Sequence, residues 1–364
     1  MTDKMLRFDP DRPFNELPLL PPESDMEDVE ILKKVNKANI ALARLNGASL
    51  AVPNRTLLLE PLTVREAVAS SGIENINTTV SEVFQAELFP IAEASKPQKE
   101  TMHYKQALHF GYEFLKEKGF IATNAIREVQ TILEPEKGGI RRLPGTKIAD
   151  HITGRSYYTP PEGEDLIRSL LKNFDDYFND MATDVDPLIR NAVLHYQFEA
   201  IHPFYDGNGR TGRILMVLHL VLSGRLDLPI LFLSGYINEN RSDYYRLLRE
   251  VTASGAWKPW ILYVLHAIEV QAINTASVID RMIAIRERIE PAMREMKPAI
   301  PYKEVLEYLF SNPYYSRGRM SEALGVHPNS SLKYLNALEA KKIVTSFSFK
   351  KEKVFFMADF LKLL

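Results

Sequence analysis

The chain has no cysteine among its 364 residues. This absence excludes disulfides, thiolate nucleophiles and cysteine-ligated zinc sites. A long apolar run is also missing, since no stretch approaches the ~18 apolar residues of a membrane helix. The N-terminus (Met-Thr-Asp-Lys-Met-Leu-Arg-Phe-Asp-Pro) lacks the apolar core of a signal peptide. We therefore expect no membrane partner and a cytoplasmic location.

A strong net charge is missing as well. The chain carries 45 basic and 47 acidic side chains, a formal charge of −2. This balance argues against a surface built throughout for nucleic acid, although it allows a local basic patch. The length exceeds that of a typical compact domain, so two or three domains are expected.

Apolar residues at helical spacing dominate the chain and predict a mainly α fold. Residues 1–25 are rich in proline and acidic residues, which is typical of an extended arm laid over other elements. The spacing predicts helices over 27–46, 57–71 (interrupted by Pro61), 78–90, 98–118, 124–133, 163–180, 187–201, 211–222, 239–254 and 258–293. Turn residues between 138 and 161 separate two β-like runs, 146–152 and 156–159, and predict a hairpin.

Residues 300–364 are expected to form a separate module. Three short helical runs (304–310, 320–324 and 330–340) precede a strand pair over 343–349 and 353–357, which is the plan of a winged helix. From Tyr314 onward the module carries nine basic and four acidic side chains. This excess permits contact with DNA phosphates. Winged helices also dock proteins, so both partners stay open.

The chemistry is concentrated in residues 202–213, His-Pro-Phe-Tyr-Asp-Gly-Asn-Gly-Arg-Thr-Gly-Arg. Gly207, Gly209 and Gly212 crowd a turn that leads into an apolar helix. Backbone N–H groups at such a turn form an anion site. Arg210 and Arg213 are three residues apart, hence on one helix face, and guanidinium groups suit phosphate oxygens.

Three further side chains complete this turn. Asn208 could hold more phosphate oxygens. Asp206 supplies a carboxylate for a Mg²⁺ ion that bridges phosphates. His202 is a candidate general base for an incoming hydroxyl group. Together the groups predict nucleotidyl or phosphoryl transfer, without a P-loop, because no lysine follows the glycines. A plain Gly/Asn turn with solvated arginines is the alternative.

The motif matches the Fic-family signature His-x-Phe-x-(Asp/Glu)-Gly-Asn-Gly-Arg-x-x-Arg without departure, and the chain resembles that family over about residues 20–290. The resemblance implies a helical core that transfers AMP from ATP to a Ser, Thr or Tyr hydroxyl of a protein and releases pyrophosphate. It assigns the base to His202 and Mg²⁺ to Asp206. The ATP-binding residues that it implies are Glu74, His202, Gly207, Asn208, Gly209, Arg210, Thr211, Gly212, Arg213, Tyr244 and Tyr245.

The same resemblance implies three parts: an N-terminal arm and helical region (1–95), a catalytic core (96–290) and a winged-helix domain (300–364). The hairpin takes the place of the family's flap, where a target segment could add as a strand; a plain surface hairpin is the alternative. Tyr244 and Tyr245 take the place of aromatic contacts to the nucleotide base, although adjacent residues cannot both face it.

Residues 70–75 fit the family's inhibitory pattern, (Ser/Thr)-x-x-x-Glu-(Gly/Asn), with Ser70, Glu74 and Asn75 at its defined positions. The resemblance implies an inhibitory helix over about 66–76, whose Glu74 pairs with Arg213 and excludes the γ-phosphate. A carboxylate in an arginine fork competes with phosphate for the same donors. The alternative is a solvated residue at a helix end.

The sequence thus predicts an autoinhibited protein adenylyltransferase that uses Mg-ATP and modifies another protein or itself. Transfer of a different group is one rival. The other is a DNA-binding regulator that only senses nucleotide, against which the retained His202 speaks. A homodimer is suggested by the resemblance, and removal of AMP by water that a glutamate positions stays open.

Overall fold

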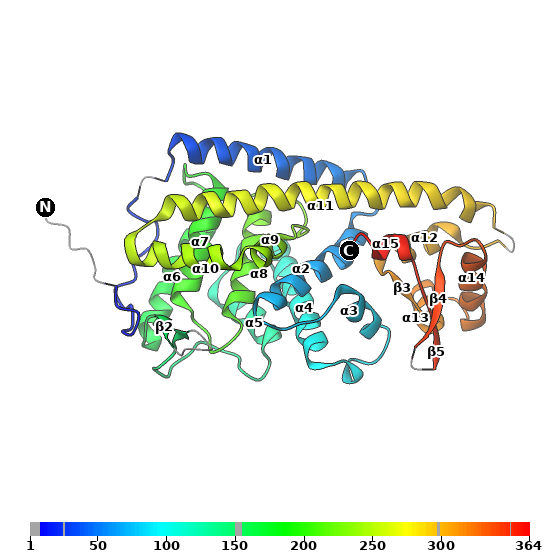
Figure 1. Cartoon of the computed structure of the whole chain (residues 1–364), viewed down its shortest axis with the longest axis horizontal. Helices are drawn as coiled ribbons and strands as arrows, with labels where there is room; N and C mark the ends of the chain where they lie inside the picture. Colours follow the sequence, from blue (N-terminus) through cyan, green and yellow to red (C-terminus); the bar gives the residue numbers. More distant parts are fainter. Residues whose placement is uncertain (1–7, 25, 150–154, 297–298, 350) are drawn as a thin grey trace, which may run out of the picture. The chain divides into compact units, whose positions relative to one another are not determined.

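The computed structural model describes residues 8–24, 26–149, 155–296, 299–349 and 351–364, and within them the fold is mainly helical (Figure 1). The β structure there consists of a small hairpin and a three-stranded sheet near the C-terminus. The chain forms two compact units. The first unit comprises Met1–Ala43, His103–Pro229 and Leu233–Gln271, and the second unit comprises Arg44–Met102, Ile230–Phe232 and Ala272–Leu364.

The first unit contains most of the long helices. Its elements are α1 (Val29–Leu50), α4 (Lys96–Lys118), α5 (Thr123–Leu133), β1 (Ile148–Ala149), β2 (Ser156–Tyr158), α6 (Glu164–Asn179), α7 (Pro187–Ile201), α8 (Asn208–Leu222), α9 (Leu233–Glu239), α10 (Arg241–Ser254) and α11 (Trp257–Arg294), of which α1, α4 and α11 continue into the second unit. Helices α7 and α8 are buried almost all round, as central core helices are. Asp186 caps α7 by accepting the Leu188 N–H at 2.8 Å, and Pro187 occupies its first turn.

The described part of the N-terminal arm contains short turns and lies over α6 and α7. Leu17 and Leu20 are buried. The Leu20 N–H donates to Asn173 Oδ1 at 2.7 Å, and Asn173 Nδ2 donates back to the Leu20 carbonyl at 2.9 Å. Gln197 of α7 donates to the Pro18 carbonyl at 2.8 Å. Side chains of α6 and α7 therefore form hydrogen bonds with backbone groups of the arm.

The predicted hairpin is present but short. Ile148 pairs with Tyr158 and Ala149 with Ser156, in antiparallel register. Part of the first predicted strand, 150–152, lies outside the described residues. Tyr158 is buried, and its hydroxyl donates to the carbonyl of Ala200 in the last turn of α7 at 2.7 Å. This bond anchors β2 beside the start of the 202–213 motif.

The second unit contains shorter elements. They are η1 (Arg55–Leu58), α2 (Leu59–Ile73), α3 (Val80–Ala86), η2 (Ile91–Glu93), α12 (Tyr302–Ser311), β3 (Tyr314–Tyr315), α13 (Arg317–Leu324), α14 (Pro328–Ala340), β4 (Thr345–Phe349), β5 (Glu352–Phe356) and α15 (Ala358–Leu361). The sheet order is β3-β5-β4, with antiparallel pairs. The predicted helical runs and strand pair are thus found, whereas η2, β3, α9 and α15 have no counterpart among the predicted elements.

One local expectation is wrong. Pro61 does not interrupt the helix that follows Leu57, because it lies in the first turn of α2. The N–H groups of a first turn have no partner within the helix, so proline removes no hydrogen bond there.

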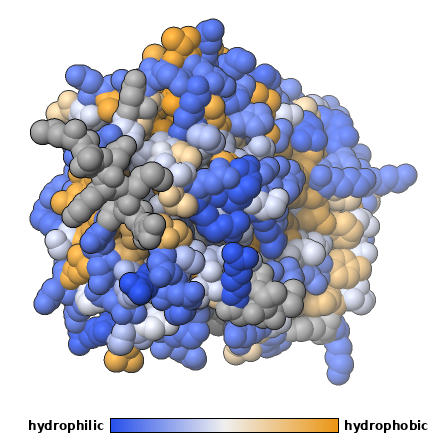
Figure 2. All heavy atoms as spheres, turned by 60° about the vertical axis from the view of Figure 1, so that its left-hand side comes forward, coloured by the Kyte–Doolittle hydropathy of each residue, from blue (hydrophilic) through white to orange (hydrophobic). Residues whose placement is uncertain are grey.

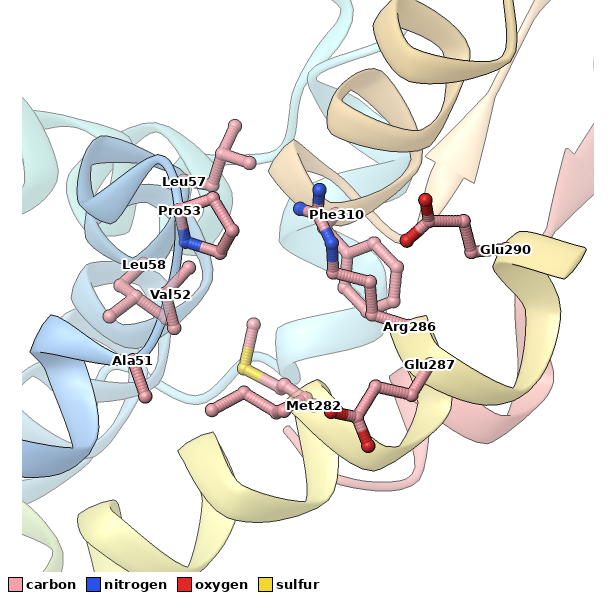
Figure 3. Close-up of a pocket in the computed structure, with 11 residues that line it drawn as sticks. Ala51, Val52, Pro53, Leu57, Leu58, Met282, Arg286, Glu287, Glu290 and Phe310 are labelled. Carbon is pink, nitrogen blue, oxygen red and sulfur yellow. The ribbon is translucent and has the colours of Figure 1, made fainter. Parts of the chain in front are cut away.

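A cavity of about 360 Å³ lies within the second unit (Figure 3). Residues 51–53, η1, α11 and α12 line it. Apolar side chains such as Val52 and Phe310 form much of the wall, and Arg286, Glu287 and Glu290 of α11 add charge. The cavity is of the size that accepts small molecules.

Helix α11 corrects the expectation that no segment approaches a membrane span. By length and composition alone it could cross a membrane. However, 56% of its most apolar window is buried, and core helices pass the same test, so this is weak evidence. On the face shown in Figure 2, hydrophilic residues predominate and apolar ones form scattered patches.

Candidate active site

His202 stands where α7 ends, in an unusual backbone conformation. Its φ of 48° and ψ of 58° are left-handed, which is uncommon for a residue other than glycine. Arg141 supports this turn, donating from Nε to the His202 carbonyl at 2.8 Å and from Nη2 to the carbonyls of Ile201, at 3.2 Å, and Pro161. The Arg141 side chain is only 1% exposed. A buried guanidinium thus fixes the backbone that presents the candidate base.

The residues next to Arg141 run along the motif and hold its first part. Ile140 forms an antiparallel bridge with Phe204, and the Arg141 N–H donates to the Pro203 carbonyl at 2.9 Å. The Tyr205 hydroxyl accepts the N–H groups of Arg142 and Leu143, at 2.8 and 3.2 Å. The loop between α7 and α8 is therefore braced by a segment about 60 residues earlier in the chain.

The start of α8 is a glycine-capped turn. Gly207 has a φ of 78° as its N-cap, a conformation that favours glycine. The amide of Asn208 is committed to the loop, because Oδ1 accepts the Phe204 N–H at 2.9 Å and Nδ2 donates to the Phe204 carbonyl at 2.8 Å. The first N–H groups of a helix have no acceptor within it, so the backbone of Asn208 and Gly209 offers donors to an anion.

Asp206 is paired with a lysine. Its Oδ2 lies 2.6 Å from Lys137 Nζ, and its Oδ1 accepts the Gly207 N–H at 2.8 Å. Burial works against ionisation, but the bonds from Lys137 and Gly207 outweigh it and hold the pKa of Asp206 below its ordinary value. Gln130, fully buried, donates to the carbonyls of Asp206 and Lys137, each at 3.1 Å. The carboxylate is thus charged, fixed and already beside a cation.

Both arginines of the motif are buried on α8. Arg210 is 2% exposed, forms an ion pair with Glu134 at the end of α5, and lies 3.9 Å from Asp206. Arg213 is 1% exposed. Its charge adds to burial in lowering the pKa of His195 to about 3, so His195 is neutral at pH 7.

Two further motif residues, Thr211 and Gly212, pack in the interior. A Cβ at Gly212 would lie 2.5 Å from Glu199 Oε1 and 3.2 Å from Phe198 Cδ1, so glycine lets α8 approach α7 closely. Thr211 is fully buried beside it. Gly209 is partly exposed in the first turn of α8.

The two adjacent tyrosines differ in environment. Tyr244 is 2% exposed, and its hydroxyl lies 2.7 Å from His195 Nε2. Tyr245 is 37% exposed. Of the pair, only Tyr245 presents its ring to solvent, whereas Tyr244 belongs to the core beneath α8.

The expected inhibitory residues lie in the second unit. Ser70 is buried within α2, Glu74 is the C-cap of that helix with an exposed side chain, and Asn75 follows with a left-handed φ of 62°. Residues 202–213 belong to the first unit. The pairing of Glu74 with Arg213 therefore stays a prediction.

Sequence reasoning missed four supporting residues: Gln130, Glu134, Lys137 and Arg141. No local pattern marks them, because their partners are 60 to 76 residues away along the chain. Gly138-Gly139 was the single usable signal, since it indicates a turn in that segment. Within the described residues, no group of three or more His, Cys, Asp or Glu side chains could hold a metal ion by itself.

Two family models match the chain. The Fic/DOC family N-terminal model matches residues 32–113, and the Fic/DOC family model matches residues 120–220. The chain belongs to the Fic/DOC family. The second match contains the end of α5, the bracing segment and the 202–213 motif.

Curated relatives include protein adenylyltransferases. The chain is 36% identical to protein adenylyltransferase fic-1 of Caenorhabditis elegans over 107 residues, 29% of this chain and 19% of that protein. It is 32% identical to protein adenylyltransferase Fic of Nematostella vectensis over 148 residues, 39% of this chain and 30% of that protein. The chain thus spans less than a third of these relatives, and what it shares with them is a related Fic domain.

Solved structures agree on the fold. A Fic family protein from Desulfovibrio desulfuricans G20 superposes with a TM-score of 0.58 at 18% identity, covering 92% of this chain and 97% of that one. Fic-1 from C. elegans gives 0.53 at 24% identity, covering 69% and 73%. The chain therefore has a mainly α-helical Fic-type fold with a small hairpin and a small C-terminal sheet.

Proposed function

We propose that the chain is a protein adenylyltransferase that moves AMP from ATP to a Ser, Thr or Tyr hydroxyl, on another protein or on itself, in the cytoplasm. The observation that carries the proposal is the braced loop from His202 to Arg213. This loop contains a histidine suited to act as a base, a carboxylate paired with Lys137 and the N-terminus of α8, and these features support the proposal. The adenylyltransferase names of the relatives support the choice of transferred group.

The proposed reaction uses the residues of this loop in sequence. His202 accepts the proton of the target hydroxyl, whose oxygen forms a bond to the α-phosphorus of ATP. The bond from that phosphorus to the bridging oxygen breaks, and pyrophosphate leaves. The N–H groups of Asn208 and Gly209 stabilise the charge that develops on the phosphate oxygens.

The residues present fit a magnesium ion. Asp206 is an ionised carboxylate that already holds the Lys137 ammonium at 2.6 Å, so the position suits a cation. One carboxylate plus substrate phosphates is a common Mg²⁺ site. Bound there, Mg²⁺ would neutralise phosphate charge. Lys137 would move aside to admit it.

Of the other residues expected to bind ATP, some would contact it directly and others would only pack behind it. We assign Arg210 and Arg213 to the β- and γ-phosphates and Tyr245 to the base. Thr211, Gly212 and Tyr244 are buried and would support the ATP site by packing.

We further propose that Glu74 inhibits transfer by pairing with Arg213, as the pattern at Ser70, Glu74 and Asn75 implies. Residues 1–95, 96–290 and 300–364 would then serve as inhibitory region, catalytic core and winged-helix domain.

The deciding experiment compares the full chain incubated with [α-³²P]ATP and with [γ-³²P]ATP. Label in protein from the α-phosphate only is expected, whereas label from the γ-phosphate would overturn adenylylation in favour of phosphoryl transfer. His202→Ala should abolish labelling and leave ATP binding nearly unchanged. His109→Ala, at an exposed histidine of α4, is the matched control and should label normally.

The inhibition has its own test with the same label. Glu74→Gly should label more strongly than the natural chain, because no carboxylate would compete for Arg213. Glu93→Gly removes another exposed glutamate of the second unit and should have no effect. Equal labelling by Glu74→Gly and the natural chain would contradict the inhibitory role.

A further inference from the structure

The C-terminal module presents a polar helix face. In α14 the side chains of Ser331, Leu335 and Leu338 are buried. Asn329, Lys333 and Asn336 recur at the same helical spacing, and all are exposed. Asparagine and lysine are among the side chains that read base edges in the DNA major groove. We call these three residues the α14 face.

Basic residues adjoin this face. The Ser331 hydroxyl donates to the Arg317 carbonyl at 2.8 Å, which places the start of α13 beside the first turn of α14. Arg317 and Arg319 are exposed there, and Lys351 is exposed at the tip of the β4–β5 hairpin. The arrangement offers phosphate contacts around a base-reading helix, the usual division of labour on DNA.

Arg319 also ties the module to α3. Its Nη2 donates to the carbonyl of Glu87, the C-cap of α3, at 2.8 Å. Tyr314 adds a second tie, since its hydroxyl lies 2.7 Å from Ser81 Oγ and accepts Gln85 Nε2 at 3.0 Å. Arg319, which adjoins the α14 face, thus also holds α3.

A common hydrophobic core continues this connection to α2. Val64 of α2, Phe84 of α3, and Tyr314 and Val354 of the module belong to one buried cluster within the second unit. Val68 of α2 packs against the same cluster. Packed cores shift between discrete arrangements instead of deforming continuously, so displacement of α3 is transmitted to α2.

Glu74 lies at the end of α2, the last helix in this connection from Arg319 through α3. Helix α2 ends at Ile73 with Glu74 as its C-cap, and α3 begins at Val80 after Thr79, its N-cap. The capping box of Thr79 and Glu82 fixes that start. Only a short linker therefore separates Glu74 from the helix that Arg319 holds.

We propose that duplex DNA bound to the α14 face takes Arg319 from the Glu87 carbonyl, and that α3 and α2 then shift Glu74 and release the transferase site. This inference rests on the inhibitory role proposed for Glu74. A phosphate oxygen is a stronger partner for guanidinium than a neutral carbonyl, which gives DNA the advantage. Coupling of this kind typically changes the affinity of the second site 5- to 150-fold.

Binding is tested by fluorescence anisotropy with a labelled 30-base-pair duplex of mixed sequence. The full chain should bind at 50 mM salt and lose affinity steeply toward 200 mM. Lys333→Glu should weaken binding at least tenfold, whereas Lys303→Glu, the same charge change at an exposed residue of α12, should leave it unchanged. Absence of binding at 50 mM salt, or equal binding by Lys333→Glu, would overturn the DNA surface in favour of a protein-docking role.

Coupling is tested by hydrogen exchange in Leu59–Ile73 and Val80–Ala86. Saturating duplex should speed exchange at the end of α3 and at the linker to α2. Arg319→Ala should raise exchange there without DNA. Tyr314→Phe removes the hydroxyl bonds and leaves the α14 face intact, so it should bind DNA normally and change the DNA-induced exchange. Binding with no change in exchange would overturn the coupling.

Labelling from [α-³²P]ATP completes the test. Duplex should raise labelling by the natural chain at least fivefold and have no effect on Glu74→Gly. If Glu74→Gly does not label at all, the proposed function fails, and the exchange measurement still judges the coupling by itself.

Discussion

Replacing Arg141 with methionine tests how the candidate base is held in place. The guanidinium is 1% exposed and donates to three backbone carbonyls, those of Pro161, Ile201 and His202. Methionine has similar length but no donor, so it would leave three buried acceptors without this partner.

These contacts set the expected loss in the free energy of unfolding. Hydrogen bonds from charged donors contribute about 1.5–3 kcal/mol each, and three of them would exceed about 4 kcal/mol. Methionine avoids the cost of burying a charge, which offsets part of this. We expect a net loss of about 3–5 kcal/mol in the free energy of unfolding. At about 2–4 °C per kcal/mol, the Tm of the first unit should fall by roughly 6–20 °C.

The neighbouring residue is a matched control. The Arg142 side chain is 70% exposed and pairs with Glu164 at 2.9 Å on the surface. Such pairs contribute about 0–1 kcal/mol, so Arg142→Met should lower Tm by no more than about 4 °C. Calorimetry of the three proteins measures the difference. Equal Tm values for Arg141→Met and Arg142→Met would refute the idea that Arg141 supports the turn.

Three further outcomes follow from the site. Gly207→Ala should weaken ATP binding, because its Cβ would lie 3.2 Å from Glu134 Cγ. Gly224→Ala, also at positive φ but in open space, should only lower Tm. Equal ATP affinity of the two variants in calorimetric titration would contradict this prediction. Lys137→Met should raise the pKa of Asp206 toward its ordinary value in a carboxyl NMR titration, and an unchanged pKa would count against their pairing. His195 has a pKa of about 3 in the folded state, against about 6.5 in the unfolded state. Its contribution to stability is therefore present above about pH 6.5 and is lost as pH falls toward 3, by at most ~1.4 kcal/mol per pH unit. His195→Gln should flatten the decline of Tm between pH 7 and 4, and an equally steep decline would contradict the assignment.

The elements that periodicity predicts well are long and amphipathic. Helix α6, for example, alternates buried Ile167, Leu170, Leu171 and Phe174 with polar residues, and was predicted within one residue at each end. Helix α9 has seven residues, too few for a periodic signal, and β3 has two residues whose strand geometry depends on pairing with β5. Such elements are determined by tertiary contacts that no local pattern records.

The candidate site likewise has residues that a local pattern reveals and residues that only tertiary contacts bring in. Residues 202–213 could be found because their chemistry is contiguous. Asn208 shows the limit of that reasoning, since asparagine side chains commonly bond nearby backbone and here close the loop onto Phe204. Glu134 and Lys137 pair with Arg210 and Asp206 across more than 60 residues, so only the packed structure brings them together.

The clamp at Arg141 also bears on how the protein folds during synthesis. The turn at His202 needs the carbonyls of Ile201 and His202 to meet one guanidinium that was synthesised about 60 residues earlier, and the same guanidinium binds the Pro161 carbonyl, 20 residues after Arg141. Contacts of such sequence separation form slowly, because the intervening chain must be ordered first. A growing chain that ends within α7 therefore contains Arg141 but not the turn at His202, and the 202–213 loop acquires its shape among the last features of the first unit.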